Sequence, residues 1–489
     1  MTRLVLLLLI ALYFFTRLYH LTILPIFFDE AIFIKWAKII ASSNQQWFIP
    51  FSGGKNILLP WLAVPFLKIF PPADFLIAGR IPSVIAGFFS ILATYKIGRL
   101  LFTSKVALLA SFFVTIAPFN LLYDRMALYD SLLCAVLAWT AYFTFKTATT
   151  LKTADGWKWG LALGIGHLAK ATAIFYSLLT PLVFIILSYQ KTKKTIFKLI
   201  AISFLTSQLV ANWTIISRGY FEYQQKALAH TPTTQSLLVN PFLVFTRNIS
   251  WTFDWLTSYY TLPIFITVLI SFGYLLKVQR IKALAFLALT VVPVFIFCFI
   301  ARDYFPRYLL FTTPIVFLSL SYFICSVTFR FKNKLLLKAF LVLGLLFLPL
   351  KFDYHLLTNP PEAELPQADN WQYITGFPSS YGFAPIYRFL DTKLRNGPVT
   401  LVVEGSYSHY PYAFELYYWN NKNITIMEKW PLEMTPEIRQ ATRNSQVYIV
   451  IGHTTWPAQR ETVKRLPLEI VLVATKPGGQ DPIYLTTLK

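Results

Sequence analysis

Long apolar runs separated by short polar segments fill the first 355 residues of the chain. A bilayer core of about 30 Å needs about 20 apolar residues per helix. By this measure we expect membrane spans near residues 4–24, 76–97, 106–122, 127–146, 158–170, 171–189, 196–216, 259–276, 283–301, 308–328 and 335–354. The pattern therefore predicts a polytopic α-helical membrane protein with about eleven transmembrane helices.

The apolar run between residues 158 and 189 fits either one overlong helix or two short helices that meet near Lys170. Basic residues form clusters between the runs, at Lys96/Arg99/Lys105, Lys146/Lys152/Lys158, Lys191/Lys193/Lys194/Lys198, Lys277/Arg280/Lys282 and Arg330/Lys332/Lys334/Lys338. With two short helices all of these clusters fall on one side of the membrane together with Arg3, and an excess of basic residues marks the cytoplasmic side. Two helices are therefore the better interpretation, and residues 25–75 and 217–258 become outer loops.

The expected outer loop of residues 25–75 contains an amphipathic segment, DEAIFIKWAKII, which begins at Asp29. Its apolar residues share one helical face, whereas Lys35 and Lys38 point away from that face. The residues of the apolar face are Ile32, Phe33, Trp36, Ile39 and Ile40. A helix of this kind is typical of the membrane interface.

The pattern changes near residue 356, where prolines and acidic residues return and apolar positions alternate. Alternation with a period of two predicts β-strands. We expect strands at 399–405, 423–429, 445–452, 468–475 and 483–488, with helices at 384–396 and 435–444. The chain is therefore expected to have a transmembrane domain of residues 1–355, which includes the two outer loops, and an extracytoplasmic α/β domain of residues 356–489.

The composition supports a membrane protein, since 56% of the residues are hydrophobic and only 13% are charged, compared with about 25% in soluble proteins. The net charge of +22 could indicate nucleic-acid binding, but the cations lie in short clusters between apolar runs, as in cytoplasmic loops. The three cysteines lie inside apolar segments, which argues against a disulfide framework or a zinc site. The N-terminal run lacks a small-residue cleavage site, so we expect a retained helix rather than a signal peptide.

Ionisable residues gather where the expected spans meet the outer side of the membrane. These residues are Asp29, Glu30, Lys55, Asp124, Arg125, Asp130, Lys170, Arg302, Asp303 and Arg307. Each has a structural alternative, because Asp29 or Asp130 can cap a helix and Arg125, Lys170 or Arg307 can anchor a helix end at the interface. Ionisable groups at such depth are costly and usually functional, so acids and cations together on one membrane face favour a site.

Sugar transfer from a polyprenyl-phosphate donor needs this combination of groups. The leaving phosphate is a weak base that requires cations to stabilise its growing charge. The incoming hydroxyl group needs a general base, which one carboxylate supplies. A single displacement of this type inverts the anomeric centre.

Six stretches between about residues 5 and 330 carry a family resemblance, in this order: FFDEAIFIKWA, GGKNILLPWLAVPFLKIF, RIPSVIAGFFSILATYKIGRLLF, YDRMALYDSLL, LALGIGHLAKATAIF and YFPRYLLFTTP. They resemble the GT-C class of membrane glycosyltransferases. The nearest likeness is the branch that joins the dolichyl-phosphate-mannose protein O-mannosyltransferases and the bacterial lipid A aminoarabinose transferase. This resemblance implies a GT-C-like fold and a sugar carried on polyprenyl phosphate.

The resemblance also implies catalytic residues. The catalytic base of the family, in the first outer loop, matches Asp29, with Glu30 beside it. A second acid of the family matches Asp130, and the arginine before that acid matches Arg125. Asp29, Glu30 and Asp130 are therefore the expected catalytic residues.

Positions that bind the donor phosphate in the family match Lys55, Lys170 and the pair Arg307–Tyr308, and Arg125 joins this group. Gly54 stands where some relatives have an acid. We therefore assign no metal ligands, and we expect any dependence on a divalent cation to be weak or absent.

The sequence thus predicts an inverting glycosyltransferase of the cell membrane that transfers a sugar to a protein, a lipid or a glycan on the outer side. A transporter or flippase of lipid-linked saccharides is the alternative from another class. Such proteins tend to carry polar groups at the middle of the membrane and repeated halves, and this sequence has neither feature. A non-catalytic relative that binds only lipid phosphate is a third alternative, which the intact pair Asp29–Glu30 disfavours.

Overall fold

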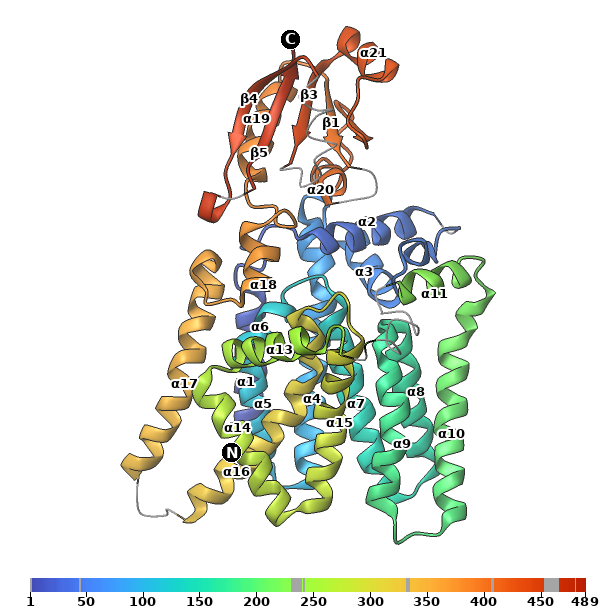
Figure 1. Ribbon diagram of the computed structural model, residues 1–489, viewed down its shortest axis with the longest axis vertical. Coiled ribbons are helices and arrows are strands. Elements are labelled where there is room, and N and C mark those ends of the chain that lie inside the picture. Colours follow the sequence, from blue (N-terminus) through green and yellow to red (C-terminus); the bar gives the residue numbers. More distant parts are fainter. Residues whose placement is uncertain are drawn as a thin grey trace. The chain divides into compact units, whose positions relative to one another are not determined.

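The computed structural model describes residues 2–43, 45–229, 240, 242–330, 335–405, 409–452, 466–479 and 481–489 (Figure 1). Residues 331–334 of the predicted inner loop, with Lys332 and Lys334, lie outside these ranges, as do residues 230–239 and 241 of the predicted outer loop. The chain forms two compact units. The first comprises Met1–Leu21, Asn44–Leu62 and Arg80–Pro366, and the second comprises Thr22–Ser43, Ala63–Gly79 and Gln367–Lys489.

The first unit is helical, and Figure 1 shows most of its helices running roughly alongside one another, with α13 lying across them. Its elements are α1 (Thr2–Leu18), η1 (Ile49–Gly53), α5 (Ser104–Ile116), α6 (Pro118–Asp124), α7 (Tyr129–Thr150), α8 (Thr153–Ala169), η3 (Ala171–Ala173), α9 (Ile174–Ser188), α10 (Lys193–Asn212), η4 (Trp213–Ile216), α11 (Tyr220–Leu228), α13 (Phe245–Tyr260), α14 (Leu262–Val278), α15 (Arg280–Ile300), η5 (Pro306–Thr312), α16 (Thr313–Arg330) and α17 (Leu335–Thr358). Two further helices, α3 (Leu58–Ile69) and α4 (Phe75–Leu101), belong partly to each unit.

Among the described residues, 6 helical segments are long and apolar enough to cross a membrane, or up to 8 if each bent pair forms one span. One pair, α5 and α6, bends by 62° at Ala117, whose extended backbone (ψ 123°) precedes Pro118. A proline disfavours the helical conformation in the residue before it, which explains this break. The prediction of a polytopic α-helical membrane protein is confirmed, and every predicted span overlaps at least one helix.

The predicted break near Lys170 is also confirmed. The helix α8 ends at Ala169, Lys170 has an extended backbone (φ −158°, ψ 140°), and η3 leads into α9. Close packing of α8 against α10 depends on glycine, because a Cβ atom at Gly160 would lie 2.4 Å from the carbonyl oxygen of Ser203. Small residues allow such close approach between membrane helices.

The second unit contains a five-stranded sheet in the order β2-β1-β3-β5-β4. Its elements are α2 (Phe28–Ser42), α18 (Gln367–Asn370), η7 (Trp371–Thr375), α19 (Phe383–Leu394), β1 (Val399–Glu404), α20 (His409–Tyr417), β2 (Ile424–Lys429), α21 (Pro436–Asn444), β3 (Gln446–Ile451), β4 (Leu468–Ala474), η8 (Pro477–Gly479) and β5 (Ile483–Leu488). Strand β1 pairs in parallel with β2 and β3, whereas β5 pairs antiparallel with β3 and β4. The predicted strands and both predicted helices are present, so the α/β class is confirmed.

Part of the predicted first outer loop folds with this sheet unit. Phe27 forms an antiparallel bridge with Ser379, and α2 packs against α20. The predicted polar positions Lys35 and Lys38 are partly exposed; Lys35 contacts Glu415 of α20, and Lys38 contacts Trp419, which follows α20. The domain boundary at residue 355 stays a prediction. In the packing, the segments Thr22–Ser43 and Ala63–Gly79 join Gln367–Lys489 in the second unit.

Candidate active site

Four of the predicted site residues meet in the first unit, and we call them the Asp130 cluster: Asp130, Lys170, Arg307 and Tyr308. The ammonium group of Lys170 donates a 2.6 Å hydrogen bond to Oδ1 of Asp130. The Nε atom of Arg307 lies 4.0 Å from Oδ2 of the same carboxylate. Lys170 also lies over the ring of Tyr308, 4.0 Å from its centroid. One acid is thus shared by two cations, and one of these contacts an aromatic face.

Each member of the cluster stands at the end of a helix. Asp130 occupies the first turn of α7, where a negative charge is stabilised by the helix dipole. Lys170 occupies the extended residue between α8 and η3. Arg307 is the second residue of η5 and follows Pro306, which has the fixed backbone angle that suits the first position of a helix. The helix ends therefore bring together residues that are far apart in the sequence.

Two residues of α13 hold the turn that leads into η5. Arg247 donates a 2.9 Å hydrogen bond to the carbonyl oxygen of Arg302. Asn248, which is fully buried, donates to the carbonyl oxygens of Ala301 (2.8 Å) and Cys298 (3.2 Å). Sequence reasoning did not identify this pair. The available signal was an asparagine next to an arginine in a helix otherwise rich in aromatic residues.

Lys55 lies near the Asp130 cluster in a turn that depends on glycine. Gly54 has a left-handed backbone (φ 67°) that favours glycine. The next residue, Asn56, donates a 2.7 Å hydrogen bond to the carbonyl oxygen of His167, and its own carbonyl oxygen accepts from the hydroxyl group of Tyr129. These bonds tie the turn to the ends of α7 and α8, and the charge of Lys55 acts on Lys170.

Asp124 forms a second polar group in the first unit, which sequence reasoning had joined to the same constellation. Its carboxylate lies 3.3 Å from the guanidinium group of Arg17 and accepts a 2.8 Å hydrogen bond from Ser131. Arg17 is fully buried and also donates to the carbonyl oxygen of Thr115. A buried charge pair with these partners is a structural contact between α1, α5 and α6.

Arg125 belongs to this second group and does not join the Asp130 cluster. Its guanidinium group donates 2.7 Å hydrogen bonds to the carbonyl oxygens of Thr16, Tyr19 and His20. These are carbonyl groups at the C-terminal end of α1, which have no partner within the helix and favour a positive charge. Arg125 therefore caps α1, and its assignment to the donor phosphate stays a prediction that this geometry does not support.

The predicted catalytic pair Asp29–Glu30 lies in the second unit, in the first turn of α2. Glu30 is fully buried, and its Oε2 atom accepts a 3.0 Å hydrogen bond from the backbone N–H of Phe27. This contact is one half of a capping box. Capping of α2, which was the structural alternative for Asp29, is thus made by Glu30, and Asp29 lies beside it partly exposed.

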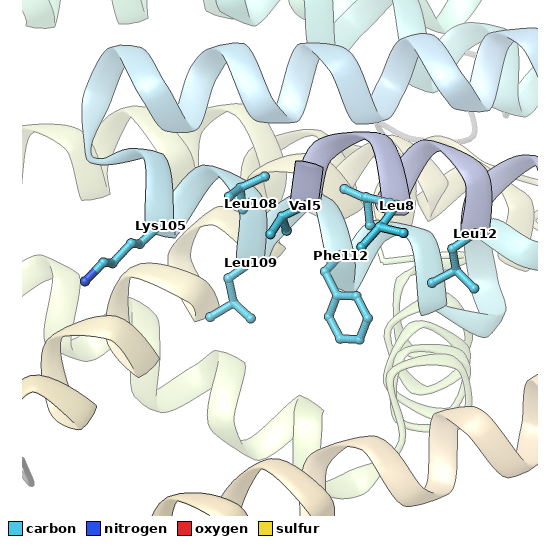
Figure 2. Close-up of a pocket in the computed structure, with 8 residues that line it drawn as sticks. Val5, Leu8, Leu12, Lys105, Leu108, Leu109 and Phe112 are labelled. Carbon is cyan, nitrogen blue, oxygen red and sulfur yellow. The ribbon is translucent and has the colours of Figure 1, made fainter. Parts of the chain in front are cut away.

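An open apolar groove of about 470 Å³ runs between α1 and α5 (Figure 2). Its lining residues are Val5, Leu8, Leu9, Leu12, Lys105, Leu108, Leu109 and Phe112. Lys105 stands at one end of the groove and its ammonium group points away from the apolar side chains (Figure 2). These lining residues include no acid or nucleophile.

The residues that the structure describes contain no group of three or more His, Cys, Asp or Glu side chains that could hold a metal ion. The acid of the Asp130 cluster is surrounded by cations. A cation site would need several oxygen or nitrogen ligands of negative or neutral charge. The arrangement of the Asp130 cluster suits an anion instead.

Comparisons with known proteins show a family likeness over part of the chain. The family model described as dolichyl-phosphate-mannose-protein mannosyltransferase matches residues 54–213. The matched region includes Lys55, Asp130 and Lys170, whereas Asp29 and Arg307 lie outside it. No curated protein sequence matches the chain significantly.

Solved structures match almost the whole chain. The crystal structure of ArnT from Cupriavidus metallidurans in the apo state is 12% identical, has a TM-score of 0.62, and covers 99% of this chain and 97% of its own. The same protein bound to undecaprenyl phosphate gives 11% identity, a TM-score of 0.61 and the same coverage of 99% and 97%. The archaeal oligosaccharyltransferase AglB from Archaeoglobus fulgidus, in complex with an inhibitory peptide and a dolichol-phosphate, is 13% identical with a TM-score of 0.53, over 92% of this chain and 69% of its own.

At this low sequence identity the solved structures show a common fold alone. The similarity in sequence comes from the family model, which matches residues 54–213. The chain has the GT-C fold and resembles the membrane glycosyltransferases of the mannosyltransferase and ArnT branch.

Proposed function

We propose that the protein is an inverting glycosyltransferase that moves a hexosyl or pentosyl group from a polyprenyl-phosphate donor to a protein, lipid or glycan acceptor on the outer side of the membrane. The observation that carries this proposal is the Asp130 cluster together with Lys55. Lys170 and Arg307 both contact the carboxylate of Asp130, and the charge of Lys55 acts on Lys170. A cluster rich in cations at the ends of apolar helices favours an anionic ligand.

A lipid-linked phosphate is an anionic ligand that suits this cluster of cations. Arg307 offers a planar fork that suits phosphate oxygens, and the lysines act as point charges. Helix ends at the membrane interface are also where a ligand with an isoprenoid tail and a water-soluble head would place its phosphate. The ArnT structure of the same fold is bound to undecaprenyl phosphate, which is a ligand of this class.

In the proposed reaction the acceptor oxygen attacks the anomeric carbon of the donor sugar and forms a new glycosidic bond. The bond between that carbon and the phosphate oxygen breaks, and its electron pair stays on the polyprenyl phosphate. Lys170 and Arg307 stabilise the charge that develops on this leaving group. The acceptor proton passes to Asp29, which acts as general base. Glu30, whose carboxylate caps α2, keeps the backbone of this helix turn in place.

A transporter would use the same residues in a different way. A flippase of lipid-linked saccharides would bind the donor phosphate in the same way but would form no glycosidic bond and need no general base. The likeness to the mannosyltransferase family over residues 54–213 favours the enzyme. The two functions separate in a reconstituted system, since only the enzyme releases free polyprenyl phosphate from the donor.

Direct binding of polyprenyl phosphate tests the phosphate site. Purified protein in detergent should bind undecaprenyl phosphate, and Lys170→Ala or Arg307→Ala should each weaken this binding by about 10-fold or more, since one charge-assisted hydrogen bond contributes about 1.5–3 kcal/mol. Lys351→Ala is the matched control, because Lys351 forms an exposed ion pair with Glu364 in the same unit. Equal binding by all three variants would remove the phosphate site.

A further inference from the structure

The N-terminal end of α2 is held by the C-terminal part of the second unit. The backbone N–H of Phe28 donates a 3.1 Å hydrogen bond to the carbonyl oxygen of Pro378, and Phe27 forms an antiparallel bridge with Ser379. The ring of Phe27 packs edge to face on Tyr373 at 4.8 Å. Because Asp29 directly follows Phe28, these contacts fix the backbone at the residue before the proposed base.

The middle of α2 is held by α20 and the turn that follows it. Lys35 forms a partly buried ion pair with Glu415 of α20. One helix turn further on, the ammonium group of Lys38 lies 4.3 Å from the ring centroid of Trp419, within the range of a cation–π interaction. Two adjacent cations of α2 thus contact one acid and one aromatic ring that lie more than 370 residues away along the chain.

The helical periodicity separates these contacts from the acid. Residues of an α-helix advance by about 100° each, so Lys35 and Lys38 lie about 120° and about 180° around the axis from Asp29. Asp29 instead shares its face with Trp36, which lies about 20° away on the same basis. The segment of α20 and the turn after it therefore contacts α2 on one side, and the face of α2 that carries Asp29 points away from α20.

We propose that the C-terminal part of the second unit, Gln367–Lys489, positions the acid-bearing helix α2. Glu415 is the main positioning residue. This inference rests on the proposed function, in which Asp29 is the general base. It gives the sheet unit a part in the reaction that is independent of acceptor binding. A displacement of about 1 Å in a catalytic group lowers rates by about 100-fold. Loss of the contact between α2 and Glu415 should therefore lower turnover, although Glu415 touches no substrate.

Charge reversal at Glu415 tests the contact between α2 and α20 without any activity assay. In Glu415→Lys the new cation faces Lys35 and Lys38, and hydrogen exchange measured by mass spectrometry should become at least about 10-fold faster in peptides covering residues 27–42. The double variant Lys35→Glu/Glu415→Lys restores the ion pair and should restore slow exchange. Glu437→Lys is the matched control, since Glu437 forms an exposed ion pair with Lys429 in the same unit. If Glu415→Lys fails to fold, Glu415→Gln makes the same test with a smaller change.

Kinetic measurements then test whether the contact between α2 and Glu415 affects the reaction. Glu415→Lys should lower kcat by about 10- to 100-fold, leave the KM for the donor within about 2-fold, and recover in the double variant. Unchanged exchange of residues 27–42 in Glu415→Lys would overturn the positioning role, whatever the reaction is. Faster exchange with normal kcat, in a protein that Asp29→Asn inactivates, would also overturn it. Normal turnover by Asp29→Asn would instead overturn the role of Asp29 as general base in the proposed function and leave the exchange result standing.

Discussion

Lys170 donates a 2.6 Å hydrogen bond to Asp130, a residue 40 positions earlier in the chain, and this bond joins the break between α8 and α9 to the first turn of α7. Arg307 lies 4.0 Å from the other oxygen of the same carboxylate. Two cations of the cluster therefore share this acid. In the proposed function, the donor phosphate adds a second anion beside these cations.

The variant Asp130→Asn tests separately how this carboxylate affects thermal stability and how it affects ligand binding. Removal of the carboxylate breaks its contacts with Lys170 and Arg307, and breaking a buried charge pair costs about 3–5 kcal/mol, so thermal stability should fall. Undecaprenyl phosphate should raise the melting temperature of this variant by more than it raises that of the wild type, because the ligand replaces the missing negative charge. The measurement is thermal unfolding with and without the ligand. A smaller shift in the variant would mean that Asp130 itself contacts the ligand favourably.

Asp29→Asn should leave the protein folded and able to bind the donor, and it should lower turnover by about two to four orders of magnitude, which is the usual contribution of a positioned general base. The change keeps the size of the side chain and removes its basicity. Transfer of sugar from a polyprenyl-phosphate donor, measured at saturating donor, checks this expectation. Near-normal transfer would reduce Asp29 to a structural residue and would make Asp130 the next candidate for the base.

The helical spans, the break at Lys170 and the strands of the C-terminal unit could be predicted from the sequence, because each rests on a local pattern of apolar residues. The meeting of Asp130 with Lys170 and Arg307 was expected from their shared place at the outer ends of the spans. The sequence could not separate Arg125 from this group. Arg125 and Asp130 are close neighbours in the chain, and only the packing of α1 turns Arg125 towards the carbonyl oxygens of Thr16 and Tyr19.

The contacts between distant segments could not be predicted. Arg17 is buried against Asp124, and nothing in the local sequence around either residue indicates this contact. The partners Lys35 and Glu415 lie at opposite ends of the chain and have no local signal for their pairing. Such contacts depend on tertiary packing, which a single sequence does not display.

Arg125→Lys should lower stability and leave donor binding unchanged. Lysine keeps the charge but lacks the planar fork that reaches three carbonyl oxygens at once. Loss of two hydrogen bonds to a charged group should cost about 3 kcal/mol or more, visible in thermal unfolding, while the affinity for undecaprenyl phosphate should stay within about 2-fold. Normal stability combined with weak donor binding would return Arg125 to the phosphate site.

The predicted membrane topology has a direct test by cysteine labelling. The basic clusters place the loops at 99–105, 147–157 and 330–334 in the cytoplasm and residues 356–489 outside. Asn421 and Lys152 are both exposed, so Asn421→Cys should react with an impermeant reagent in intact cells, and Lys152→Cys should react only after permeabilisation. The native residues Cys134, Cys298 and Cys325 are replaced first. The opposite labelling pattern would invert the whole topology.

The C-terminal unit should become less stable as the pH rises, because of Glu404. This residue ends β1, is only 8% exposed, and accepts a 2.9 Å hydrogen bond from the backbone N–H of Gly452. Its other carboxylate oxygen is buried and has no hydrogen-bond partner among the residues that the structure describes. Burial raises the pKa of Glu404 from 4.5 to about 7, against the opposing effect of the Gly452 N–H group. The folded state therefore holds this proton at pH values where the unfolded state has released it.

It follows that the stabilisation is complete at low pH and is lost as the pH rises from about 4.5 towards about 7. Glu404→Gln keeps the hydrogen bond to Gly452 and removes the charge. This variant should match the wild type near pH 5 and exceed it in stability near pH 8 by about 2–3 kcal/mol, since each pKa unit corresponds to about 1.4 kcal/mol. Hydrogen exchange in peptides from β1 and β3, compared at the two pH values after correction for the intrinsic rate, measures the difference. A variant no more stable than the wild type at pH 8 would show that the buried carboxylate of Glu404 is ionised without cost.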